Sequence, residues 1–253
     1  MTSETLVLIP SRLRATRLPN KPLALIGGKP MIVQVYLRAL EAAIGEVVVA
    51  CDSPEIRDAI EVEGGRAVLT DPALPSGTDR IAAALQEVDR GRRFQRIVNL
   101  QGDIPTVDPA TVAAAAAALG REDADIGTVV TPTTSKEERL NPNVVKAVGT
   151  PITDRQYRAL YFSRSPVPYG EGDCFHHIGI YSFRRDSLER FVTLPPSPLE
   201  QREKLEQLRA LENGMRIDFS VVDTVPLGVD TPADLAAANR FFDDLAANSH
   251  LTD

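Results

Sequence analysis

Residues 6–51 read LVLIPSRLRATRLPNKPLALIGGKPMIVQVYLRALEAAIGEVVVAC, and the fold class is decided within this stretch. Its two ends, Leu6–Ile9 and Val47–Cys51, are short apolar runs typical of buried strands. Between them Pro30–Ala43 is expected to be a helix, with a proline at its first turn. A strand, a helix and a second strand predict a parallel unit, so the chain begins as an α/β fold.

The same alternation continues to about residue 130. Further buried strands are expected at Ala67–Leu69, Arg96–Leu100 and Ile126–Val130. Further helices are expected at Pro54–Glu63, Thr78–Val88 and Pro109–Leu119. This pattern predicts a mostly parallel sheet with helices on both faces.

After Ser135 the regular helical crossovers stop. Strand-like runs follow at Val144–Val148, Tyr157–Ser163 and Gly179–Phe183. A helix is then expected from Ser197 through Asn213, a strand over Arg216–Val222, and a closing helix from Thr231 to about Ala247. Because no linker or repeat is visible, we predict a single domain over residues 1–253. Its insertion-like, β-rich region at about 135–195 would form an added sheet element or a subunit contact.

Composition excludes several classes of protein. The formal net charge of −7 argues against a nucleic acid or an anionic membrane as partner. The apolar run Leu6–Ile9 is too short for a signal-peptide core or a membrane span. Cys51 and Cys174 are far apart, which favours neither a disulfide framework nor a zinc site. We therefore expect the protein in the reducing cytoplasm.

Positive charge is concentrated at the start of this acidic chain. No Asp or Glu occurs from Thr5 to Leu40, yet six cations do: Arg12, Arg14, Arg17, Lys21, Lys29 and Arg38. Four of them fall in the loop 10–22 after the first strand, where ligands of open parallel sheets bind. Arginine forks and a lysine suit a triphosphate, although the loop is neither a P-loop nor a glycine-rich dinucleotide turn. The alternative is an ordinary solvated basic loop.

Two aspartates at strand ends are candidate ligands of a divalent cation. Asp103 follows Gly102 after the fourth strand, where it could bind magnesium or only cap the turn before Pro105. Asp230 precedes Thr231, which suits the N-cap of the last helix and leaves this carboxylate over. Since Asp52-Ser53-Pro54 repeats the same pattern, spacing alone favours a structural role for Asp230.

Two other polar pairs are not assigned by spacing. His176 and His177 precede an apolar run, but their spacing is not that of a zinc site, so a structural hydrogen-bonding role is favoured. Glu206 and Gln207 lie on an expected helix, where Glu206 could simply form a surface ion pair with Arg202.

Taken together, these segments resemble the 3-deoxy-manno-octulosonate (KDO) cytidylyltransferases over about Leu6 to Phe242. Nine pieces carry the resemblance in order: IPSRLRATRLPNKPL (9–23), GKPMI (28–32), SGTDR (76–80), NLQGDIP (99–105), NPNVVK (141–146), ALYFSR (159–164), HIGIY (177–181), PSPLEQREKLEQLRAL (196–211) and GVDTP (228–232). The resemblance implies a Rossmann-like, doubly wound fold of the nucleotide-sugar transferase type, with a small added β element for dimerisation. It also implies transfer of CMP from CTP to KDO, with release of pyrophosphate.

The same resemblance implies roles for individual residues. It assigns the CTP phosphates to Arg12, Arg17 and Lys21, and the cytosine to Ser76 and Arg80. It places Mg²⁺ on Asp103 and Asp230, which makes these two aspartates, Lys21 and Arg12 the expected catalytic residues. The acidic sugar is expected near Gln101, Arg164, His177, Tyr181, Glu206 and Gln207.

The resemblance further implies a homodimer and a pathway that feeds lipopolysaccharide assembly. One departure is visible, since many relatives have glutamate after Gln-Gly-Asp where this chain has Ile104. Two alternatives stay open from the sequence. One is a cytidylyltransferase for another sugar acid, such as an amino-KDO or a nonulosonic acid, and the other is a nucleotide-binding protein without catalysis.

Overall fold

The computed structural model describes residues 4–14, 18–120, 122–133 and 135–249. The chain divides into two compact units. The first comprises Met1–Phe94, Asn99–Pro109 and Pro226–Asp253, and the second comprises Gln95–Val98 and Ala110–Val225. None of the helices in the described ranges has the length and apolar character that a bilayer crossing requires.

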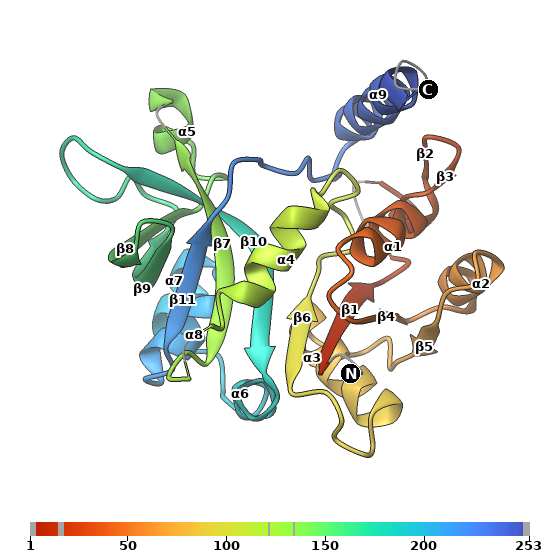
Figure 1. Cartoon of the computed structure of the whole chain (residues 1–253), viewed down its shortest axis with the longest axis horizontal. Helices are drawn as coiled ribbons and strands as arrows, with labels where there is room; N and C mark the ends of the chain where they lie inside the picture. Colours follow the sequence, from red (N-terminus) through yellow and green to blue (C-terminus); the bar gives the residue numbers. More distant parts are fainter. Residues whose placement is uncertain (1–3, 15–17, 121, 134, 250–253) are drawn as a thin grey trace. The chain divides into compact units, whose positions relative to one another are not determined.

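A parallel sheet forms the centre of the first unit (Figure 1). Its strands are β1 (Thr5–Ser11), β4 (Glu46–Cys51) and β5 (Ala67–Leu69), in the order β5-β4-β1. All seven residues of β1 are buried, so this strand has protein on both faces. Each fully buried Leu, Ile or Val contributes roughly 1.5–3 kcal/mol of transfer free energy, which is why short apolar runs suffice to specify these strands.

Helices cover both faces of this sheet. α1 (Met31–Glu41) and α2 (Pro54–Val62) pack against each other, while α3 (Gly77–Val88) packs on β1, β4 and β5. From β1 the chain forms β4 and then β5 on one side of β1. It then crosses back to the other side of β1, where Leu100 N–H donates to Leu8 O. Right-handed crossovers in opposite directions place α3 on the face opposite α1 and α2.

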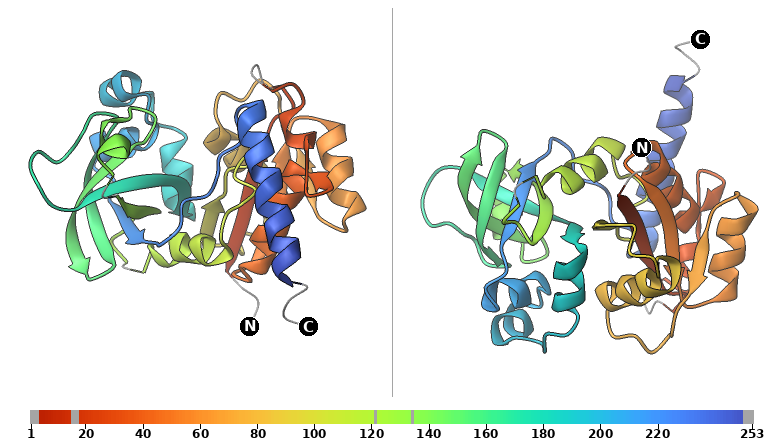
Figure 2. Two further views of the ribbon diagram at one scale, coloured as in Figure 1. Left: turned by 90° about the horizontal axis from the view of Figure 1, so that it is seen from above. Right: turned by 60° about the horizontal axis from the view of Figure 1, so that its bottom comes forward.

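The C-terminal helix α9 (Pro232–Ser249) returns to the start of the first unit (Figure 2). It contacts β2 (Leu25–Ile26), which pairs with β3 (Lys29–Pro30) just after the short 3-10 helix η1 (Lys21–Leu23). A small apolar cluster joins these segments and contains Ile26, Met31, Val229 and Ala238. This packing fixes the segment around Val229 against the element that carries Lys21.

The second unit contains a mixed sheet in the order β6-β10-β7-β11-β9-β8. Its strands are β6 (Arg96–Asn99), β7 (Ile126–Thr133), β8 (Lys146–Thr153), β9 (Gln156–Ser163), β10 (Cys174–Arg184) and β11 (Ile217–Val221). Its helices are α4 (Pro109–Ala117), α5 (Lys136–Leu140), α6 (Arg185–Phe191), α7 (Pro198–Glu203) and α8 (Gln207–Glu212). β7 and β11 are parallel, whereas β10 pairs antiparallel with β7 and β8, and β9 pairs antiparallel with β11 and β8.

The α/β class and the Rossmann-like arrangement predicted from the sequence are confirmed, and β8 and β9 supply the expected added β element. The prediction of a single helix from Ser197 through Asn213 is wrong, because this segment forms two helices, α7 and α8. The chain breaks between α7 and α8 at Lys204, which adopts a left-handed conformation with φ of 58°. β10 also begins at Cys174, five residues before the expected Gly179.

Candidate functional site

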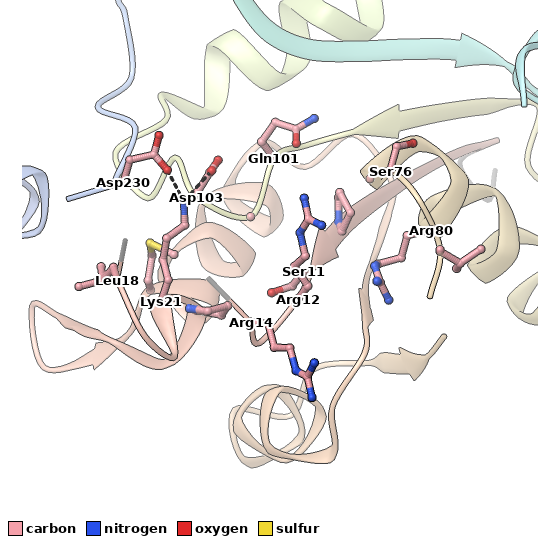
Figure 3. A pocket seen from close by; sticks show the side chains of 16 residues that line it. Ser11, Arg12, Arg14, Leu18, Lys21, Ser76, Arg80, Gln101, Asp103 and Asp230 are labelled. Carbon is pink, nitrogen blue, oxygen red and sulfur yellow. Dashed lines mark hydrogen bonds and ion pairs between the residues drawn. The ribbon is translucent and has the colours of Figure 1, made fainter. Parts of the chain in front are cut away.

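A cavity of about 460 Å³ opens in the first unit at the carboxyl ends of its strands (Figure 3). Its wall combines the loop after β1, the turn after β6 and the first turn of α3. The chain runs from β1 to β4 on one side of β1 and later returns to its other side. Ligands of open α/β sheets bind at such a switch in strand order. The volume lies within the range of cavities that hold small molecules and cofactors.

Seven of the predicted site residues line this cavity: Arg12, Lys21, Ser76, Arg80, Gln101, Asp103 and Asp230. Arg17, which was expected to bind phosphate, lies outside the described residues. Arg14 lines the cavity as well, although the family resemblance gave it no role. The described wall therefore carries four cationic and two acidic side chains, a balance that favours a polyanion accompanied by a cation.

Lys21 connects the two aspartates that were predicted to bind a metal. Its Nζ lies 2.9 Å from Asp103 Oδ2 and 2.8 Å from Asp230 Oδ1 (Figure 3). Burial lowers the pKa of Lys21, but the two carboxylates more than offset this effect, so the pKa is raised above its ordinary value. The ammonium is therefore charged at neutral pH, and it holds the two carboxylates around one point.

Asp230 reaches this point because the cap of α9 does not need it. Thr231 Oγ1 accepts the Asp234 N–H at 3.2 Å, which confirms that the threonine is the N-cap. Val229 N–H donates to Asp103 O at 2.9 Å and ties the two aspartate-bearing segments together. Thr231 thus caps α9 as expected, and the Asp230 carboxylate pairs with Lys21.

Gly102 allows the Asp103 turn to lie against β1. A Cβ at this position would lie 2.8 Å from Pro10 O and 3.1 Å from Ile32 Cδ1. The tight neighbours of Gly102 are the protein's own backbone and core.

Replacing Gly102 with alanine is therefore expected to destabilise the fold by about 1–3 kcal/mol, because backbone and core must shift to admit the methyl group. Urea unfolding of Gly102→Ala, compared with Gly91→Ala, checks this expectation. Gly91 has open space around its Cβ position, so its variant should stay within about 0.5 kcal/mol of the parent. Equal stability of the two variants would contradict the steric argument.

Ser76 and Arg80 lie on α3, at the end of the cavity away from the aspartates (Figure 3). Ser76 is the N-cap of α3 and accepts the Asp79 N–H at 3.1 Å. Arg80 is buried, and its Nη1 donates to Thr70 Oγ1 at 2.5 Å. A buried guanidinium held by protein oxygens presents its remaining donors in a fixed direction.

Gln101 lines the same cavity from the turn after β6. Its Nε2 donates to Asn99 Oδ1 at 3.4 Å. The other residues that the resemblance assigned to the sugar, Arg164, His177, Tyr181, Glu206 and Gln207, belong to the second unit.

Arg164 follows β9 and holds the break between α7 and α8. Its guanidinium donates to the carbonyls of Glu203 at 2.8 Å, Pro142 at 3.0 Å and Lys204 at 3.3 Å. Its backbone N–H donates to Glu203 Oε2 at 2.9 Å. These contacts give Arg164 a structural role that the sequence did not predict, whatever else it binds.

His177 and Tyr181 lie on β10 with their rings 5.5 Å apart. His177 Nε2 lies 3.0 Å from Thr128 Oγ1, which itself donates to Ile180 O at 2.8 Å. Burial lowers the pKa of His177 to about 3, so its ring is neutral. Burial and the charge of Glu206 raise the pKa of Tyr181, which keeps its phenol protonated.

Glu206 and Gln207 begin α8, just after the break at Lys204. Glu206 Oε1 lies 4.0 Å from Arg209 Nη2. Gln207 is only 4% exposed, and its Nε2 has no hydrogen-bond partner among the described residues. An unpaired buried amide carries a desolvation cost, so Gln207 is a donor available to a ligand.

The donors around Lys21 fit a magnesium ion. Carboxylate oxygens are the hard ligands that Mg²⁺ prefers, and one or two of them suffice when substrate phosphates and water complete the octahedron. Asp103 and Asp230 already converge on one cation, the Lys21 ammonium. In the described ranges, no group of three or more His, Cys, Asp or Glu side chains forms a metal cage.

Comparisons with known proteins agree with this geometry. The model of the cytidylyltransferase family matches residues 6–217. A relative from Rhodopseudomonas palustris (strain BisB5), named 3-deoxy-manno-octulosonate cytidylyltransferase, is 59% identical over 93% of this chain and 96% of its own length. One from Paramagnetospirillum magneticum with the same name is 58% identical over 92% of this chain and 95% of its own length.

A solved structure points the same way. It is described as CMP:2-keto-3-deoxy-manno-octonic acid synthetase complexed with CTP. It matches 96% of this chain and 99% of its own, with a TM-score of 0.88 and 38% sequence identity.

Proposed function

The chain belongs to the cytidylyltransferase family, and from this premise we propose that it transfers CMP from CTP to the anomeric hydroxyl of KDO and releases pyrophosphate. The observation that carries the proposal is the cavity in which the basic loop after β1 meets both aspartates. Relatives with nearly 60% identity over almost the whole chain are named for this activity.

Recognition of CTP is assigned to the first unit. Arg12, Arg17 and Lys21 bind the triphosphate, since guanidinium forks and an ammonium pair with phosphate oxygens. Ser76 and Arg80 recognise the cytosine. In-line attack of the sugar hydroxyl on the α-phosphorus requires alignment and neutralisation of developing charge, so these cations act by positioning and electrostatics.

Asp103 and Asp230 hold Mg²⁺ in this proposal. When bound, a divalent cation makes the attacking hydroxyl more acidic and neutralises charge on the α-phosphate. The ammonium of Lys21 lies between these carboxylates. With a divalent cation held there, Lys21 would be available to pair with a phosphate and to stabilise the charge on the departing pyrophosphate.

Recognition of the acidic sugar is assigned to Gln101, Arg164, His177, Tyr181, Glu206 and Gln207. Neutral His177 and protonated Tyr181 bring hydrogen-bonding groups for hydroxyls, and Gln207 brings an unpaired donor. Arg164 is the assigned partner of the sugar carboxylate, with the guanidinium donors that its carbonyl contacts do not use.

The biological setting follows from the same assignment. The chain acts as a homodimer in the cytoplasm, with β8 and β9 as the added dimerisation element. Its product, CMP-KDO, is used in lipopolysaccharide assembly. Sedimentation at micromolar concentration tests the dimer directly.

Pyrophosphate release tests the reaction. Wild-type protein with CTP, KDO and Mg²⁺ is expected to release pyrophosphate. Reactions in which UTP replaces CTP, sialic acid replaces KDO, or chelator is added should release none. Turnover with another sugar acid but not with KDO would replace the substrate and keep the chemistry. Retention of CTP without consumption under any condition would favour a binding protein.

A further inference from the structure

Asp52 lies at a turn with the same local pattern as the Asp230 turn, an aspartate followed by a hydroxyl residue and a proline. In Asp52-Ser53-Pro54 the serine caps α2, because Ser53 Oγ accepts the Ile56 N–H at 3.4 Å. In Asp230-Thr231-Pro232 the threonine caps α9 in the same way. At both turns the cap leaves the preceding carboxylate for another partner, and at Asp230 that partner is Lys21.

The Asp52 carboxylate meets two parts of the nucleotide cavity. Its Oδ1 accepts the Leu13 N–H at 2.8 Å, which lies in the basic loop between Arg12 and Arg14. Its Oδ2 lies 4.0 Å from Arg80 Nη2. Only 10% of the Asp52 side chain and 4% of the Arg80 side chain are exposed, so solvent screens this pair weakly.

A second contact holds Arg80 from the carboxyl end of the neighbouring strand β5. Its Nη1 donates to Thr70 Oγ1, and the Thr70 hydroxyl donates to Cys51 O at 3.0 Å. Thr70 is a neutral partner, so the negative charge facing this guanidinium in the described contacts comes from Asp52. One carboxylate therefore connects the loop that carries Arg12 with the guanidinium at the far end of the cavity.

We propose that Asp52 is a positioning residue for the nucleotide, which sets the phosphate-binding loop and the base-recognising Arg80 in register with each other. The proposal rests on the proposed function, because that function assigns Arg12 to the triphosphate and Arg80 to cytosine. Asp52 itself touches neither substrate. Its loss changes the spacing between two binding groups and not the reacting centre.

Asparagine and alanine separate the two contacts of Asp52. Asp52→Asn keeps an oxygen that accepts the Leu13 N–H but removes the negative charge that faces Arg80. Asp52→Ala removes both contacts. Asp58→Asn is the matched control, since Asp58 lies on α2, is 61% exposed and pairs with Arg57 outside the cavity.

Calorimetric titration with CTP in the absence of sugar is the first measurement, followed by KM and kcat and by thermal unfolding. Asp52→Asn is expected to bind CTP about tenfold more weakly, and Asp52→Ala still more weakly, because charge-assisted contacts are lost. The KM for CTP should rise in parallel while the KM for KDO and kcat stay within about threefold, and discrimination against UTP should fall. Asp58→Asn should match the parent.

CTP affinity and UTP discrimination of Asp52→Asn within twofold of the parent would overturn the proposal, even if its unfolding temperature falls. If Asp52→Ala does not fold, Asp52→Asn decides, because it preserves side-chain volume. Failure of the proposed function gives a different result: wild-type protein would bind CTP without releasing pyrophosphate, and the affinity comparison at Asp52 would still be readable.

Discussion

Replacing Asp230 with asparagine is expected to lower kcat about a thousandfold while weakening CTP binding less than tenfold. In the proposed mechanism the amide would remove a charged metal ligand, and a divalent cation at a developing phosphate charge is worth several kcal/mol in the transition state. Lys21 remains paired with Asp103 at 2.9 Å, so the turn keeps one of its two ion pairs. Steady-state pyrophosphate release and CTP titration measure the two effects separately.

Asp103→Asn should give a loss of the same size, and the double variant should be little worse than either single one, because the two carboxylates act on one cation. Asp243→Asn is the control and should retain full turnover, because Asp243 is exposed on α9, the helix that follows Asp230. Near-normal kcat of Asp103→Asn and Asp230→Asn with magnesium would refute the proposed role of these residues.

Lowering the pH from 6.5 to 4.5 is expected to remove about 2–3 kcal/mol from the free energy of unfolding through His177 alone. In the fold the pKa of His177 is lowered to about 3, first by burial and then by His176, whereas the unfolded chain has the ordinary value of 6.5. Below pH 6.5 the unfolded state therefore binds a proton that the folded state does not. Stability then falls by about 1.4 kcal/mol per pH unit until the folded pKa is reached.

Urea unfolding of the wild type and of His177→Gln between pH 7.5 and 4.5 measures this slope. The variant loses packing at every pH, so its absolute stability is not the quantity compared. The slope of unfolding free energy against pH should differ between the two proteins by nearly 1.4 kcal/mol per pH unit below pH 6. Parallel curves for the two proteins would show that the imidazole is solvated or paired with an acid in the fold.

The regular first part of the chain was predictable because its elements carry strong local signals. β1 and β4 each contain an unbroken apolar run, Leu6–Ile9 and Val47–Cys51, and Ser53 with Pro54 marks the start of α2. The break between α7 and α8 was not predictable. Lys204 adopts a left-handed conformation that its own sequence does not favour, and the carbonyls at the break are held by Arg164, 40 residues earlier.

The candidate site shows the same limit. Spacing placed Asp103 at a strand end, but the meeting of Lys21 with Asp230, 209 residues away, depends on how α9 packs on β2. Asp52 and Asp230 both precede a helix N-cap in the same local pattern. Spacing alone therefore cannot show whether either aspartate has a role beyond its position next to the cap. The family resemblance supplied the role of Asp230 and was silent on Asp52, whose significance lies in long-range contacts to Leu13 and Arg80.

The bridge formed by Lys21 also gives the cavity a built-in counter-ion. Two carboxylates held close together repel each other, and this repulsion would push the segment around Asp230 away from Asp103 if nothing balanced it. The Lys21 ammonium supplies that balance from within the chain. If Asp103 and Asp230 hold magnesium as proposed, the ion would replace a positive charge that the chain already supplies at this point.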